Sequence, residues 1–65
     1  MKYVFIETLN EDLEAVFDML ANMDSREVIT RRLTSVSSII GAKLPFWHLL
    51  RLKKKLKRLG AAMYL

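Results

Sequence analysis

Leucines near the carboxyl-terminal end of the chain recur at alternating intervals of three and four residues, at Leu49, Leu52, Leu56 and Leu59. Because an α-helix turns once every 3.6 residues, this spacing places all four side chains on one face, as in the seam between packed helices. The pattern predicts a helix from about Pro45 to Leu59. Proline is tolerated in the first turn of a helix, and Gly60 is suited to end it.

The opposite side of this predicted helix is strongly basic. Six lysines and arginines fall on it or beside it, and two aromatic residues precede them. Lys and Arg clustered on one helix are typical of proteins that bind nucleic-acid phosphates. This surface is the candidate binding site, and it consists of Arg51, Lys53, Lys54, Lys55, Lys57, Arg58, Phe46 and Trp47.

Charge is divided between the two ends of the chain. Residues 1–25 contain six carboxylates and one base, whereas residues 26–65 contain ten bases and one carboxylate. The formal net charge of +4 conceals this division. Such asymmetry indicates an electrostatic partner, either another molecule or the opposite half of the chain itself.

The size of the chain limits how it can be stabilised. With 65 residues we expect a single domain, residues 1–65, and domains this small are commonly reinforced by disulfides, a metal or a second subunit. Cysteine is absent and His48 is the sole histidine, so we expect neither a disulfide nor a metal site. Because 52% of the residues are apolar, we expect self-association, most simply as a homodimer.

The preceding part of the chain predicts two more helices after a short extended segment. Residues 2–7 are β-branched and aromatic, which favours a strand paired with a dimer mate, although helical spacing also allows them to extend the first helix. That helix is predicted over residues 9–22, with Thr8 and Glu11 at capping-box spacing. A second helix follows from about residue 25, ends before Gly41, and carries the apolar stripe Ile29, Leu33, Val36 and Ile40.

The predicted fold is therefore mostly α: a small three-helix domain with an N-terminal extended segment or helix extension. The leucine seam and the stripe of the second helix are assigned to the core or to an oligomer interface. No signal peptide and no transmembrane segment are expected, which favours the cytoplasm over a membrane.

No catalytic constellation is recognisable in the sequence. The serines have no histidine at a suggestive spacing, and the two glycines are isolated, so no phosphate-cradling loop is expected. We therefore expect a non-enzyme, with no cofactor and no small-molecule substrate. The function is predicted to be regulation by binding.

Three interpretations of the basic helix remain open. Among specific partners nucleic acid leads narrowly, and the excess of lysine over arginine favours contact with phosphates over the reading of bases. The alternative is a small inhibitor or adaptor, of the kind common in phages and mobile elements, which docks this amphipathic helix on a larger protein through Phe46 and Trp47. In the third, the basic face is merely solvated and Trp47 belongs to the core.

Overall fold

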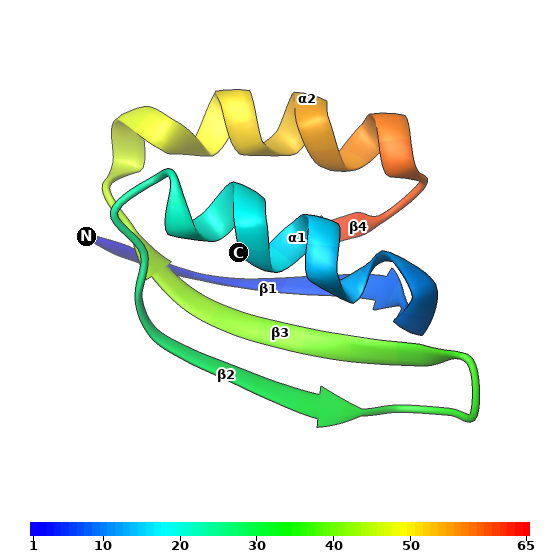
Figure 1. The fold of residues 1–65 in the computed structure, drawn as a ribbon. Helices are drawn as coiled ribbons and strands as arrows, with labels where there is room; N and C mark the ends of the chain where they lie inside the picture. Colours follow the sequence, from blue (N-terminus) through cyan, green and yellow to red (C-terminus); the bar gives the residue numbers. More distant parts are fainter.

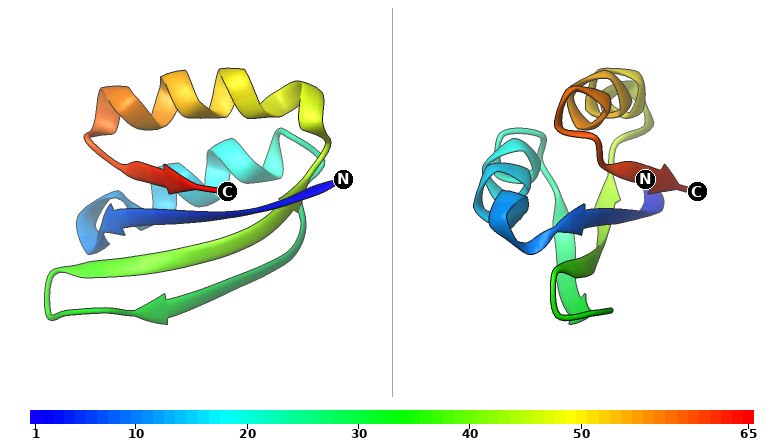
Figure 2. Two further views of the ribbon diagram at one scale, coloured as in Figure 1. Left: turned by 180° about the vertical axis from the view of Figure 1, so that it is seen from behind. Right: turned by 90° about the vertical axis from the view of Figure 1, so that its right-hand side faces the viewer.

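The computed structural model describes all 65 residues as two layers, a four-stranded antiparallel sheet and two helices that cover one of its faces (Figure 1). Short 3-10 turns at Asn10–Asp12 and Phe46–His48 lead into the helices. The elements follow one another as β1 (Lys2–Leu9), α1 (Leu13–Ala21), β2 (Arg26–Arg32), β3 (Ser37–Leu44), α2 (Leu49–Leu59) and β4 (Ala62–Tyr64). Figure 2 shows the helices side by side on one face and nothing on the other.

The strands are ordered β2-β3-β1-β4 across the sheet. Strand β1 pairs with β3 over its whole length, from Lys2 opposite Leu44 to Leu9 opposite Ser37. On its other side it pairs with β4. This β-α-β-β-α-β order with interleaved strands is the ferredoxin-like, or split βαβ, topology. Because that topology supports many unrelated functions, function has to be argued from the surfaces of this chain.

The prediction of a mostly α, three-helix domain is wrong, because the second predicted helix is the β2–β3 hairpin. Val28, Ile29 and Thr30 form a β-branched run, which favours a strand. Between the strands, Thr34 Oγ1 accepts hydrogen bonds from the backbone N–H groups of Val36 (3.2 Å) and Ser37 (3.1 Å). Such local bonds offer the backbone a turn in place of a helix.

The apolar stripe assigned to that helix is divided by the hairpin. Ile40 is buried on the helix-covered face of β3, whereas Ile29 is 58% exposed on β2. Leu33 and Val36 are exposed at the turn that joins the two strands. Successive residues of a strand face opposite sides, so a spacing of three and four residues does not keep side chains on one face.

Residues 2–7 are extended, as part of β1. Their backbone groups pair with β3 and β4 of the same chain, so the strand needs no dimer mate. Thr8 is also in β1, where its side chain is buried, and α1 has no side-chain cap. The expected capping box therefore does not form.

The last helix lies close to its predicted position, with the 3-10 turn followed by α2. Gly60 adopts a left-handed conformation with φ 76°. The N–H of Gly60 donates to the carbonyl of Lys57 (3.1 Å), and that of Ala61 donates to Leu56 (3.0 Å). This is the Schellman pattern that ends many helices.

The core lies between the helices and the covered face of the sheet. Its apolar side chains are each at most 1% exposed, and they are Val4, Ile6, Val16, Leu20, Met23, Ile40, Ala42, Leu44, Leu52 and Leu56. Leu49 and Leu59 pack against this cluster and are partly buried. Neither helix is long and apolar enough to cross a lipid bilayer.

Candidate binding surface on helix α2

The orientation of α2 is fixed by its inner face. Leu52 and Leu56 are buried against the sheet, and Leu49 and Leu59 flank them. Because these leucines hold one side of the helix inward, the residues between them are held outward. The structure thus places all six predicted basic residues on the exposed part of α2, namely Arg51, Lys53, Lys54, Lys55, Lys57 and Arg58.

None of these six cations is in an ion pair. The salt bridge of the molecule joins Lys43 to Glu27 (2.9 Å) on the sheet, and α2 contains no acidic residue. Helix neighbours of like charge four residues apart, such as Lys54 and Arg58, destabilise a helix by about 0.2–0.5 kcal/mol per pair. Only Lys57 and Arg58, in the last turn, gain from the helix dipole. The folding of α2 therefore gives no reason for so many cations, whereas binding of a polyanion would relieve their repulsion.

The acidic half of the chain does not neutralise the basic helix. Helix α1 and the turn before it contain Glu11, Asp12, Glu14 and Asp18, and they lie beside α2 on the same face of the sheet (Figure 2). No carboxylate of this group comes within 4.0 Å of a cation. The division of charge along the sequence thus becomes one acidic and one basic helix, and the basic one remains available to a partner.

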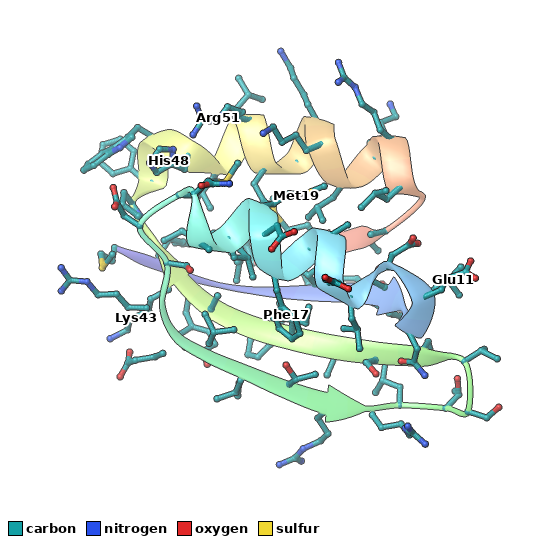
Figure 3. The ribbon with its side chains drawn as sticks, in the orientation of Figure 1. Glu11, Phe17, Met19, Lys43, His48 and Arg51 are labelled. Carbon is teal, nitrogen blue, oxygen red and sulfur yellow. The ribbon has the colours of Figure 1, made fainter.

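A cluster of exposed apolar side chains, called the aromatic knob below, lies at the start of α2. Phe46, Trp47 and Leu50 are 70%, 67% and 66% exposed, and the two rings meet edge to face with centroids 5.4 Å apart. Trp47 is therefore not a core residue, so the third interpretation is wrong about Trp47, whereas its solvated basic face stays a prediction. Beside the knob, Nη2 of Arg51 lies 2.9 Å from Nδ1 of His48, and both side chains are labelled in Figure 3.

A hollow of about 670 Å³ adjoins Trp47. Its lining combines the N-terminus, the end of α1 and the start of β2, and includes Asp24 and Arg26. Nowhere do three or more side chains come together that could hold a metal ion. The surface offers positive charge, aromatic faces and a shallow depression, all of which suit the binding of a partner.

The structure also reveals an apolar surface that sequence reasoning missed. It is the uncovered face of the sheet, which carries Tyr3, Phe5, Ile29, Ile39 and Tyr64. The alternation of Tyr3, Phe5 and Glu7 with Val4, Ile6 and Thr8 was a signal for a two-faced strand. The helical prediction over Ile29 and Ile39 concealed the rest.

Comparison of this chain with known proteins identifies no related family, protein or structure. No family model matches the chain, and none of the curated proteins or solved structures compared with it shows significant similarity.

Proposed function

We propose that this chain is a non-catalytic nucleic-acid-binding protein that holds the phosphate backbone against the outer face of α2. The observation that supports it is the set of six exposed, unpaired cations on a helix whose orientation is fixed by its leucine seam. Four of the six are lysines, whose ammonium groups act as point charges on phosphate and do not read bases. Sequence-independent binding in the cytoplasm is part of this proposal.

The aromatic knob extends the same surface. Phe46 and Trp47 are exposed at the N-terminal end of the basic helix, next to Leu50 and Arg51. An exposed indole stacks on an unpaired base with a gain of about 1–3 kcal/mol. We therefore expect single strands to bind more tightly than duplexes, because only unpaired bases offer their faces to Trp47.

The test is a fluorescence-anisotropy titration of labelled single- and double-stranded oligonucleotides at about 50 and 200 mM salt. About four phosphate contacts predict a log–log salt slope near −3.6, at about −0.9 per contact for duplex DNA. The triple variant Lys54→Glu, Lys57→Glu, Arg58→Glu should lose binding. A charge-matched control, Lys2→Glu, Arg31→Glu, Arg32→Glu, changes exposed residues of the sheet and should retain most of it.

Two results would contradict the proposal. One is the absence of binding at the lower salt concentration. The other is an equal loss of affinity in both triple variants, because that would reflect net charge and not the face of α2.

A second function, docking on a larger protein, is favoured by one specific observation. Phe46, Trp47 and Leu50 are adjacent and each about two-thirds exposed, and aromatic side chains of this kind are typical anchors in protein interfaces. For that function Trp47→Ala should weaken partner binding by about 2 kcal/mol or more, and salt should act mainly on the association rate.

A further inference from the structure

The uncovered face of the sheet carries a row of residues across all four strands, with apolar side chains on three strands and a glycine on β3. Residues that oppose each other in antiparallel strands share a face. Phe5 on β1 opposes Gly41 on β3 and Tyr64 on β4, and Gly41 in turn opposes Ile29 on β2. Phe5, Ile29 and Tyr64 are 40%, 58% and 52% exposed. This row, with Tyr3 and Ile39 beside it, is called the open face below.

A hollow of about 270 Å³ lies in the middle of the open face, over Gly41. Its other walls are Phe5, Ile29, Arg31 and Ile39. A Cβ atom at position 41 would lie 3.0 Å from the Tyr3 ring and 3.1 Å from Ile29 Cγ1, which is tighter than ordinary van der Waals contact. The Tyr3 ring and Ile29 therefore occupy the space that a side chain at position 41 would need, and the hollow lies beside them.

The next row of the open face carries opposite charges on its two sides. Arg31 on β2 opposes Ile39 on β3, which opposes Glu7 on β1. The line between β3 and β1 is the middle of the four-stranded sheet, so the arginine lies on one side of it and the carboxylate on the other. A two-fold rotation about an axis that runs parallel to this line, above the open face, places a second sheet over the first with its two sides exchanged and brings unlike charges toward each other.

We infer that the open face binds a second copy of this chain, sheet against sheet, with the two-fold axis parallel to the strands between β3 and β1. In that arrangement the partner's Phe5 lies over the hollow at Gly41, and the partner's Arg31 lies toward Glu7. The same surface serves both copies, as a two-fold interface requires. Packed sheets lie about 10 Å apart, which side chains from both faces fill.

The area of the open face suits a weak dimer. The strands β1, β3, β2 and β4 have eight, eight, seven and three residues, and each residue covers about 3.3 by 4.8 Å, which gives a face of about 410 Å². Two copies would bury about 800 Å² together, which is the size of a weak or transient interface. The dimer would also cover apolar side chains that a chain of 65 residues cannot bury alone.

A single-stranded nucleic acid is the competing occupant of this face, because Arg31 and, in the row of Tyr3, Lys43 and Arg26 also lie on it. Two features of the face favour a second copy. The Glu7 carboxylate lies within it, accepts a hydrogen bond from the Tyr64 hydroxyl (3.4 Å), and would repel phosphates. The Tyr3 ring packs on the Gly41 backbone and lies 5.2 Å from the Phe5 ring at a tilt of 52°, so it is not free to stack on a base.

The first measurement is the molar mass of the protein by light scattering and sedimentation, over a concentration series up to about 1 mM. We expect the unmodified chain to become a dimer within this range. Glu7→Arg and Arg31→Glu should each weaken the dimer about tenfold or more, because each places like charges opposite each other twice. Mixing the two variants should restore a dimer that contains one copy of each, since both contacts are then between unlike charges.

Two lysine substitutions at exposed apolar residues distinguish dimerisation through the open face from nonspecific hydrophobic association. Ile29→Lys alters the open face, and Val36→Lys alters a residue of similar exposure (62%) at the hairpin turn. Only the first should abolish the dimer. Circular dichroism of each variant checks that it is folded.

Three outcomes would overturn the inference. They are a monomer at every concentration, a dimer that both lysine variants leave intact, and charge variants that fail to complement each other. Backbone amide shifts in β1 and β3 on addition of a single-stranded oligonucleotide to monomeric protein would instead assign the open face to nucleic acid.

Discussion

Both faces of the sheet carry apolar residues, but the surroundings of the two faces differ. On β1, Val4 and Ile6 are fully buried beneath the helices, whereas Phe5 between them is 40% exposed. On β3, Ile40 is fully buried and its neighbour Ile39 is only half-buried. Strands that are apolar on both sides are typical of sheets covered on both sides. The comparison therefore indicates that this sheet has a layer on one face and lacks its counterpart on the other.

The strongest test of this comparison uses two neighbouring isoleucines. Ile40→Ala should lower the free energy of unfolding by about 2–5 kcal/mol, because it leaves a cavity in the core. Ile39→Ala removes the same atoms from the open face and should lower it by less than about 1 kcal/mol. Urea denaturation of dilute, monomeric protein measures both.

A milder variant keeps the test usable if Ile40→Ala does not fold. Ile40→Val should lower the unfolding free energy by about 0.5–1.5 kcal/mol. If Ile39→Ala had as large an effect as Ile40→Ala in the monomer, the two faces would not differ in the way the structure shows.

Gly41 lies on the open face, and a larger residue there tests how closely the side chains of this face pack. Gly41→Val adds a branched side chain where even a Cβ atom would lie 3.0 Å from the Tyr3 ring. Overpacking of this kind destabilises by about 1–3 kcal/mol, and the valine would also fill the hollow. We expect a lower urea midpoint together with loss of the dimer, and Gly41→Ala should lie between the variant and the unmodified chain.

The serines at the start of β3 repeat the comparison with polar side chains. Ser38 is buried on the covered face, and its hydroxyl donates a hydrogen bond to Asn10 Oδ1. Ser38→Ala should lower the unfolding free energy by about 1 kcal/mol. Ser37→Ala removes an exposed contact with Thr34 (2.8 Å) and should change it by less than about 0.5 kcal/mol. Equal effects in urea denaturation would mean that the Asn10 contact contributes nothing.

Sequence reasoning succeeded where structure is local. The helix at α2 follows from leucines within eleven residues of each other, and its basic face follows from the same spacing. It failed for the sheet, since the partners of Phe5 are residues 41 and 64, and no local pattern specifies them. The candidate site on α2 was therefore predictable, whereas the open face was not.

An irregularity in β2 also weakened the sequence pattern that would have indicated the β2–β3 hairpin. The register of β2 shifts between Arg26 and Ile29, and Glu27 has a positive φ of 52°. This bulge interrupts the alternation that would have marked a strand. What remained was the three-and-four spacing of Ile29, Leu33 and Val36, which matches a helix by coincidence.

The smallest expected effect concerns the ion pair of Lys43 with Glu27 at the β2 edge of the sheet. Both side chains are largely exposed (45% and 62%), and such pairs contribute about 0–1 kcal/mol. Glu27→Gln should therefore lower the unfolding free energy by less than about 0.5 kcal/mol, and this loss should shrink further in high salt. Glu27→Gly loses the same pair but removes a left-handed conformation that is unfavourable by about 1–2 kcal/mol in a residue with a side chain. Part of that gain is offset by the greater freedom of glycine in the unfolded chain, so the glycine variant should be slightly more stable than the glutamine variant in urea. The opposite order would mean that the freedom of glycine in the unfolded chain outweighs the relief of the left-handed conformation, because both variants lose the ion pair. A loss of about 1 kcal/mol or more in Glu27→Gln would mean that the ion pair, and with it the uncovered side of the sheet, stabilises the monomer more than the comparison of the two faces allows.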